Sequence, residues 1–301
     1  MTAFKEIISI LKISIPVPEQ TQDIRHAKAI TDATFDIHSI GWCSDKNVVL
    51  LENLKEGTVI LSKSAFEKFK NVEPLLTLIP VENPRLSFSK ILQHFFISRP
   101  TYGEIAKSAT IHPSVSYQKE VVSIGANVVI ENDCTIGSNV TIGPNTVIKS
   151  NTIIADNCSI GCNCTIGGVG FGYEQNERNE YELLPHIGNV HLKSGVEIGN
   201  NVCIDRAVMG STLLSENVKV DNLVHIAHGV QIGKNSLIIA NAMIAGSVVI
   251  GENVWIAPSA SVRQKIEIGN NSLIGLGAVV VKNIDSNVIV AGNPAKEFLK
   301  K

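Results

Sequence analysis

Residues 214–280 read LSENVKVDNLVHIAHGVQIGKNSLIIANAMIAGSVVIGENVWIAPSASVRQKIEIGNNSLIGLGAVV. Every sixth residue of this stretch is aliphatic, without a miss: Leu214, Val220, Ile226, Ile232, Ile238, Ile244, Ile250, Ile256, Val262, Ile268, Ile274 and Val280. A period of six fits neither an α-helix nor a single β-strand, whose side chains repeat every 3.6 and 2 residues. It is typical of a solenoid in which each hexad supplies one short strand and one turn.

The period also predicts how the coils stack. Three strands close one triangular coil, so residues 18 apart lie above one another on one face, about 4.8 Å apart. The aliphatic residue fills the interior, and the residue two before it is always small or β-branched. The residue after it is Gly, Ala or Ser in most hexads, which we interpret as room for a tight bend. The sequence therefore predicts a mainly β fold, a parallel β-helix.

The same period begins earlier and is interrupted once. It runs through Ile124, Ile130, Ile136, Ile142, Ile148, Ile154, Ile160 and Ile166, and it then fails between Gly167 and Leu184. The interrupting segment opens with GGVGFGY and continues with polar and charged residues. Long loops in a regular scaffold are often functional. A tolerated insertion without a function is the alternative.

Residues 1–100 lack the period and read as a small α/β unit. We expect three strands, at Val48–Leu51, Thr58–Leu61 and Leu75–Val81, and two helices, at Ala65–Lys70 with Ser64 as its cap and from Asn83-Pro84 to Pro100. The predicted domains are thus an α/β domain at 1–100, a β-helix at 101–285 and a short tail at 286–301.

Length and net charge argue against some classes of function. The chain has 301 residues and a net charge of −2, which does not suggest a nucleic-acid or membrane-surface partner. Lys5 and Lys12 interrupt the apolar opening, so we expect no signal peptide and a cytoplasmic protein.

Cysteine and histidine do not suggest a metal site. Cys134, Cys158 and Cys164 each lie two before an aliphatic position, where a small interior residue is expected, so we interpret them as reduced structural thiols. The nearby histidines are His186, His191, His225 and His228, and no third histidine lies 18 residues from His225 or His228. We expect no metal.

The 18-residue spacing places His228, Gly246 and Gln264 in one column at a corner of the solenoid. An exposed imidazole can act as a general base, and a glycine N–H one coil away can stabilise an oxyanion. The column therefore suggests acyl transfer. An inert surface histidine is the alternative.

Several segments follow one another in an order that resembles a known family: Gly170-Phe171-Gly172-Tyr173, Pro185-His186-Ile187-Gly188, Ile204-Asp205-Arg206, Asp221-Asn222 and Ile226-Ala227-His228. The chain resembles the hexapeptide-repeat acyltransferases, which are left-handed parallel β-helices that work as homotrimers with sites between subunits. Among them it is most similar to the UDP-3-O-(3-hydroxyacyl)glucosamine N-acyltransferases of lipid A synthesis.

The resemblance implies roles for individual residues. Catalysis would fall to His228 and Gly246, and binding of the sugar nucleotide to Phe171, Gly172, Tyr173, His186, Asp205, Arg206, Asn222 and His225. Donor binding would fall to Gln264, Lys265, Gly277, Asn293 and Lys296. The chain departs from the family pattern at Val169, where the family has Asp, and at Lys265, where it has a second His.

The segment Gly292-Asn293-Pro294-Ala295-Lys296 resembles instead the end of the acetyltransferases that use CoA. The main expectation is therefore an N-acyltransferase that moves an acetyl or short 3-hydroxyacyl group from acyl-CoA to a UDP- or dTDP-linked amino sugar of a surface polysaccharide. It would use acyl-CoA as co-substrate and no bound cofactor. The alternatives are the lipid A enzyme with acyl carrier protein as donor, and a non-catalytic β-helix scaffold.

Overall fold

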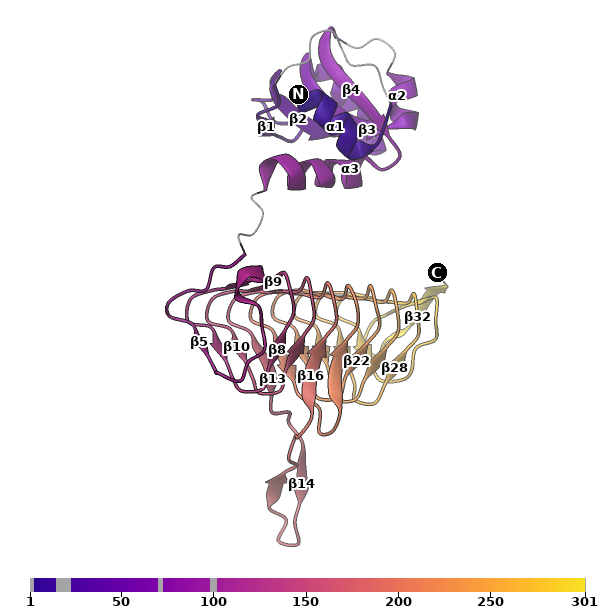
Figure 1. The fold of residues 1–301 in the computed structure, drawn as a ribbon. Helices are drawn as coiled ribbons and strands as arrows, with labels where there is room; N and C mark the ends of the chain where they lie inside the picture. The colour runs from indigo at the N-terminus through magenta and orange to yellow at the C-terminus, as the bar shows by residue number, and fades with distance from the viewer. Residues whose placement is uncertain (1–2, 15–22, 70–72, 98–101, 301) are drawn as a thin grey trace. The chain divides into compact units, whose positions relative to one another are not determined.

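The computed structural model describes residues 3–14, 23–69, 73–97 and 102–300. The chain forms two compact units, which span residues 1–99 and 100–301 (Figure 1). In the described residues, no helix is long and apolar enough to cross a membrane.

The first unit is a four-stranded parallel sheet covered by helices. Its strands pair in chain order. They are β1 (His26–Ala27), β2 (Ser39–Trp42), β3 (Glu56–Ser62) and β4 (Leu75–Val81), and the helices are α1 (Ala3–Leu11), α2 (Lys63–Lys68) and α3 (Pro84–Ile91), with a 3₁₀ turn η1 (Asp45–Asn53) and a π turn η2 (Leu92–Phe96). The predicted strands at Thr58–Leu61 and Leu75–Val81 are present as parts of β3 and β4.

Helix α3 begins as its sequence predicts. The Asn83 side chain accepts a hydrogen bond from the Leu86 N–H, and Pro84 takes the first helical position, where no N–H is needed. The helical run continues as the π turn to Phe96. The predicted stop at Pro100 lies outside the described residues.

Two predictions for this unit are wrong. The segment Val48–Leu51 is not a strand but part of η1, because Val48 and Leu51, three residues apart, turn toward the core while Val49 stays exposed. The cap of α2 is Ser62, not Ser64, since the Ser62 hydroxyl accepts from the Ala65 N–H at 3.0 Å. Helix α2 therefore starts earlier than expected. Lys70, the predicted end, lies outside the described residues.

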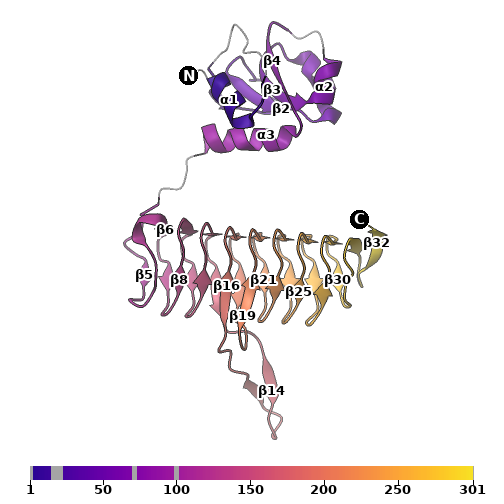
Figure 2. The same cartoon turned by 45° about the vertical axis from the view of Figure 1, so that its right-hand side comes forward.

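The second unit is a parallel β-helix of three long sheets (Figures 1 and 2). The nine-stranded sheet contains β5 (Thr110–Ile111), β7 (Val129–Ile130), β10 (Val147–Ile148), β13 (Thr165–Gly168), β18 (Cys203–Asp205), β21 (His225–Ile226), β24 (Met243–Ile244), β27 (Ser261–Val262) and β30 (Val279–Val280). The seven-stranded sheet contains β8 (Thr135–Ile136), β11 (Ile153–Ile154), β16 (Asn189–Leu192), β19 (Ser211–Leu214), β22 (Gln231–Ile232), β25 (Val249–Ile250) and β28 (Glu267–Ile268).

The ten-stranded sheet completes the triangle. It contains β6 (Val122–Ile124), which follows the 3₁₀ turn η3 (Lys119–Val121), then β9 (Val140–Ile142), β12 (Ser159–Ile160), β17 (Glu197–Ile198), β20 (Lys219–Val220), β23 (Leu237–Ile238), β26 (Trp255–Ile256), β29 (Leu273–Ile274), β31 (Val288–Ala291) and β32 (Lys296–Lys300). The predicted stacking of residues 18 apart is present, as in the pairing of His225 with Met243 and of Met243 with Ser261.

The interior of the β-helix is a continuous apolar column, and its few polar side chains form hydrogen bonds with the backbone. The aliphatic residue of each hexad is buried. The interior residue two before it is often Thr, Ser or Cys, and its side chain donates to a backbone carbonyl, as Thr146 does to Gly161 O at 2.7 Å and Cys164 does to Gly199 O at 3.1 Å. The buried cysteine thiols thus donate the same kind of hydrogen bond as the threonine and serine hydroxyls. Burial raises the pKa of the Cys164 thiol.

The tight bend of each hexad is not made where the sequence suggested. The backbone turns at the residue three before the aliphatic one, which is mostly Asn with a positive φ, such as 59° at Asn145 and 58° at Asn235. Asn tolerates this left-handed conformation better than most residues do. The small residue after the aliphatic one serves stacking instead. A Cβ on Gly143 would lie 2.7 Å from the backbone of Gly161 on the next coil.

The sequence predicts a short C-terminal tail at 286–301, and the two strands found between residues 288 and 300 extend the β-helix. Strand β31 pairs in parallel with β29 as the next coil would, and β32 folds back antiparallel on β31. The interrupting loop forms a hairpin of β14 (Tyr173–Gln175) and β15 (Tyr181–Leu183), which projects outward from the β-helix (Figures 1 and 2).

Candidate functional site

A hollow of about 390 Å³ lies at the corner of the β-helix that follows the nine-stranded sheet. Its lining comes from stacked coils and from the interrupting loop: Phe171, Asp205, His225, Ala227, His228, Met243, Ala245, Gly246, Ser247, Gln264 and Lys265. The predicted column of His228, Gly246 and Gln264 is therefore brought together. Backbone hydrogen bonds join the coils there, from Ser247 N–H to His228 O and from Lys265 N–H to Gly246 O.

The imidazole of His228 lies directly over Gly246. A Cβ built on Gly246 would be 2.7 Å from both Cε1 and Nε2 of His228, so only glycine leaves room for the ring. Among the described residues, the Gly246 N–H donates to no backbone carbonyl. Burial, and then the neighbouring His186, lower the pKa of His228 below its ordinary value. The site thus holds an uncharged imidazole beside a backbone donor.

Asp205, on the preceding coil, and His225, on the strand that leads to His228, form one wall of the hollow. Strands β18 and β21 are neighbours, with Cys203 opposite His225, and the Nε2 atom of His225 lies 3.6 Å from Oδ2 of Asp205. Burial raises the pKa of Asp205, and the adjacent His225 opposes that rise. The pair can hold a polar or cationic group of a bound molecule next to His228.

His186 lies behind His228 rather than in the lining of the hollow. Its Nδ1 atom is 2.7 Å from the Leu184 carbonyl oxygen, and its ring meets the His228 ring edge to face with centroids 5.2 Å apart. The residue is only 8% exposed. Its Nε2 atom has no hydrogen-bond partner in the described part of the chain.

The interrupting loop reaches the hollow through Phe171. This ring is 87% exposed and lies 5.0 Å, centroid to centroid, from the ring of Tyr173. Gly170 and Gly172 pass over His186, and a Cβ on Gly170 would lie 2.7 Å from His186 Nε2. The glycines therefore let the loop descend onto the histidine pair. Gly172 and Tyr173 themselves do not line the hollow.

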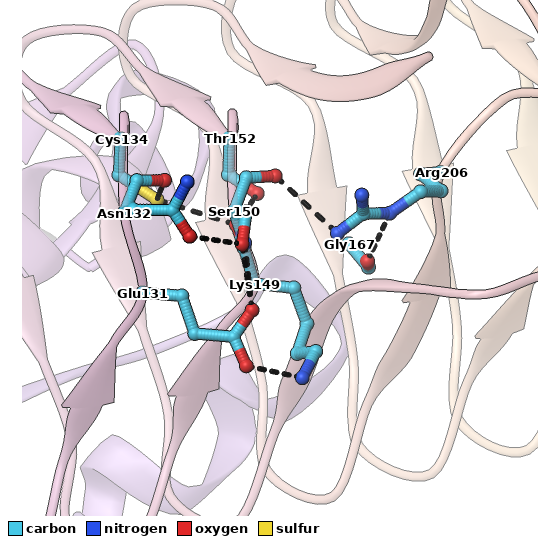
Figure 3. Close-up of polar contacts among 8 residues, drawn as sticks. All are labelled: Glu131, Asn132, Cys134, Lys149, Ser150, Thr152, Gly167 and Arg206. Atoms are coloured by element: carbon cyan, nitrogen blue, oxygen red, sulfur yellow. Dashed lines mark hydrogen bonds and ion pairs between the residues drawn. The ribbon is translucent and has the colours of Figure 1, made fainter. Parts of the chain in front are cut away.

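Arg206, for which the family resemblance implied a role in binding, does not line the hollow. Its Nε donates to the Gly167 carbonyl at 2.8 Å and its Nη2 to the Ser150 carbonyl at 3.3 Å. Figure 3 shows this guanidinium as the end of a polar network that continues through Ser150 to Glu131 and Lys149. Because Gly167 begins the interrupting loop, Arg206 holds the point at which the loop leaves the β-helix.

The Arg206 backbone works with its side chain. The Arg206 N–H donates to the Gly168 carbonyl at 2.8 Å, and the pairing of β13 with β18 shifts register there, between Ile166 and Gly168. The same shift puts Gly168 opposite Asp205. Arg206 therefore fixes both the loop and the Asp205 side of the hollow.

Four other predicted residues are not part of this hollow. Asn222, Gly277 and Asn293 lie at the corner that precedes the nine-stranded sheet, and Lys296 begins β32 beyond it. The Asn222 side chain accepts from the Asn200 N–H at 2.7 Å and so belongs to a ladder between coils. Of the predicted donor residues, the structure places only Gln264 and Lys265 beside His228.

Four lining residues were not expected from the sequence: Ala227, Met243, Ala245 and Ser247. Met243 stacks on His225 in the outward row of the nine-stranded sheet. The 18-residue spacing applied to His225 could have found it. Met243 gives the polar hollow an apolar wall.

Comparison with known proteins identifies hexapeptide repeats in the β-helix of this chain. The family described as "Bacterial transferase hexapeptide (six repeats)" matches residues 119–150, 133–168 and 247–282. The chain is 37% identical over 219 residues to "UDP-3-O-acylglucosamine N-acyltransferase 1" of Francisella tularensis subsp. holarctica, covering 66% of this chain and 62% of the relative. It is 43% identical over 219 residues to "UDP-3-O-acylglucosamine N-acyltransferase" of Methylacidiphilum infernorum, covering 65% and 59%. The chain thus spans about three fifths of the length of these curated relatives.

Solved structures support the fold. The UDP-N-acetylglucosamine acyltransferase of Francisella novicida superposes with a TM-score of 0.58 at 22% identity, covering 64% of this chain and 68% of that one. LpxA from Acinetobacter baumannii gives a TM-score of 0.57 at 24% identity, covering 64% and 72%. The fold is therefore the left-handed parallel β-helix of hexapeptide repeats that the sequence predicts.

Proposed function

We propose that this hexapeptide-repeat protein is an N-acyltransferase that transfers an acyl group from a thioester to the amine of a nucleotide-linked amino sugar. The observation that carries the proposal is the His228 ring lying over the N–H-bearing backbone of Gly246 in an open hollow. An uncharged imidazole and a backbone donor, one coil apart, can serve as the general base and the oxyanion donor of acyl transfer to an amine. The names of the relatives support the same chemistry.

In the proposed reaction, the amine nitrogen attacks the thioester carbonyl carbon and a C–N bond forms. His228 takes the proton that the amine loses, and the Gly246 N–H donates to the carbonyl oxygen as it becomes negative. The C–S bond then breaks, and the sulfur leaves as a thiol with the proton that His228 returns. Asp205 and His225 lie where they can orient the sugar beside His228.

The comparisons favour the alternative over the main expectation for the acceptor. The relatives at 37–43% identity are named for UDP-3-O-acylglucosamine, not for a surface-polysaccharide sugar. We therefore propose UDP-3-O-acylglucosamine as the first acceptor to test. A 3-O-acylated sugar also suits a hollow whose polar groups adjoin Met243 and Phe171. An experiment must decide whether the acyl donor is acyl-CoA or acyl carrier protein.

The test is a two-way panel read by mass spectrometry of the product. The acceptors are UDP-3-O-acylglucosamine, a UDP-linked amino sugar without the 3-O-acyl group, and a dTDP-linked amino sugar. Each is offered the same 3-hydroxyacyl group on CoA and on acyl carrier protein. We expect an N-acylated product that gains the mass of one acyl group, with UDP-3-O-acylglucosamine turned over fastest. No product with any pair would contradict the proposal and favour the non-catalytic scaffold.

The donor comparison has its own outcomes. A carrier-protein donor that is strongly preferred at equal concentration supports the alternative in full. Full activity with acyl-CoA supports the donor that the Gly292–Lys296 segment suggested, while the acceptor assignment is decided separately by the other axis of the panel.

A further inference from the structure

The buried imidazole of His186 has one ring nitrogen with a hydrogen-bond partner and one without. Its Nδ1 atom lies 2.7 Å from the Leu184 carbonyl oxygen, which accepts only, so Nδ1 carries the hydrogen. In a neutral imidazole the other nitrogen, Nε2, is then an acceptor. This Nε2 atom is buried and, within the described residues, bonded to nothing. Unpaired buried acceptors are costly, so they are seldom kept without a use.

The acceptor is aimed at the space between the loop and His228. A Cβ on Gly170 would lie 2.7 Å from His186 Nε2 and 2.9 Å from His228 Cβ, so both atoms border one small volume. The two rings meet at an interplanar angle of 78° with centroids 5.2 Å apart. Among the described residues, the ring of His228 has no hydrogen bond to hold it.

We propose that His186 is a positioning residue that accepts a hydrogen bond from Nδ1–H of His228 and so fixes its tautomer, leaving the Nε2 lone pair free for the amine proton. The arrangement is a chain in which His228 donates to His186 and His186 donates to the Leu184 carbonyl. The inference rests on the proposed function and deepens it. His186 exchanges no proton in this scheme.

The other ionisable side chains around the pair leave the His186 acceptor unoccupied. Besides His228, the ionisable groups that line the hollow are Asp205, His225 and Lys265, and none of them forms a hydrogen bond with His186. A carboxylate usually orients a catalytic histidine. Here the nearby carboxylate, Asp205, is paired with His225 at 3.6 Å, so His186 is the acceptor left for His228.

The first experiment reads the tautomer of His228 directly and without any substrate. The protein is labelled with ¹⁵N-histidine, and the His228 signals are assigned by their loss in His228→Gln. We expect wild-type His228 to favour the form protonated at Nδ1. In His186→Ala we expect a shift toward the Nε2-protonated form, and in His186→Gln, whose side-chain oxygen can accept, a partial return. His191→Ala, at a half-buried histidine on β16, is the control that leaves the tautomer unchanged.

The second experiment is kinetic. We expect His186→Ala to lower kcat by about 10- to 100-fold, because a misoriented base loses part of the general-base contribution. KM for the acceptor should change less than twofold, and His186→Gln should recover part of kcat.

The outcomes separate the inference from the proposed function. An unchanged His228 tautomer in both His186 variants overturns the inference, even if the enzyme is active. A normal kcat with a raised acceptor KM also overturns it, since His186 would then only support the Gly170–Gly172 loop. A wild-type protein with the expected tautomer shift but no transferase activity contradicts the proposed function alone.

Discussion

At the scale of single residues, the proposed chemistry depends on the contact between the Gly246 backbone and the His228 ring above it. The gap between them is smaller than a methyl group needs. We therefore expect Gly246→Ala to displace the imidazole and lower kcat by about 10²-fold or more, because it disturbs both the base and the N–H donor. The melting temperature should change little, since the glycine lies at an open corner. Steady-state kinetics beside a thermal melt checks this, and an active Gly246→Ala protein would contradict the geometry.

The pH dependence of the reaction follows from the pKa of His228. Burial penalises the charged imidazole, so its pKa lies below the ordinary 6.5. The base works when unprotonated, so the acidic limb that His228 contributes to kcat/KM should have its midpoint below pH 6.5. The acidic limb should persist in Asp205→Asn, which removes the neighbouring carboxyl group whose pKa burial raises. A limb centred above pH 6.5 in that variant would argue against His228 as the base.

The sequence could predict this column but not every neighbour of it. His228, Gly246 and Gln264 follow from the 18-residue spacing, because parallel coils fix which residues stack. Arg206 and His186 could not be placed in the same way. Arg206 follows a register shift, and His186 belongs to the irregular loop, so the period no longer fixes where either side chain points. The family resemblance implied substrate binding for both, and in the structure both side chains form hydrogen bonds with backbone carbonyls outside the lining of the hollow.

At the scale of elements, the network in Figure 3 holds the coil from which the loop departs. Lys149 bonds one oxygen of Glu131, and the Ser150 N–H and hydroxyl bond the other. Foremost the Lys149 bond, and then the Ser150 bonds, lower the pKa of Glu131 to about 2, against the burial that raises it. Glu131 therefore supports the fold while it is ionised.

We expect Glu131→Gln to lower the melting temperature near neutral pH by about 2–4 °C, equivalent to about 1 kcal/mol. Because the folded pKa is depressed, this contribution is present above the unfolded pKa near 4.5 and is lost as the pH falls toward 2. The difference between wild type and variant should thus shrink over that range. Glu252→Gln, in the exposed pair with Lys234, is the matched control and should cost less. Equal losses in the two variants at every pH would contradict the role of the network.

Some helices and strands of the first unit could be predicted from the sequence, and others could not. The local sequence predicts three features unambiguously: the strands at Glu56–Ser62 and Leu75–Val81, and the helix cap at Asn83. The segment at Val48–Leu51 is short and apolar, and such runs suit a strand or a turn of helix equally well. Only its packing against the core selects the 3₁₀ turn.

At the scale of the whole molecule, the hollow beside His228 is open, and Phe171 reaches it almost fully exposed. A bound donor and acceptor need a second wall, and we expect it to come from another copy of the chain in a homotrimer. Light scattering during size-exclusion chromatography should give three times the mass of one chain. A stable monomer with full activity would show that the hollow works alone.

The β-helix was predictable as a whole because one period governs most of it, from core to stacking. The first unit was less so, since its four strands and its helices each rest on weak local signals. The pairing of residues 288–300 with the β-helix could not be predicted for a related reason. Strands β31 and β32 continue the ten-stranded sheet without the hexad period.

The most direct test of the central claim is the turnover of His228→Ala in the product assay, with the best donor and acceptor of the panel. We predict that kcat falls by about 10²–10⁴-fold relative to wild type while the melting temperature is retained, because the variant loses its general base and little else. His191→Ala, purified in parallel, should keep the wild-type rate. A well-folded His228→Ala protein that acylates the sugar amine at a near-normal rate would contradict the account.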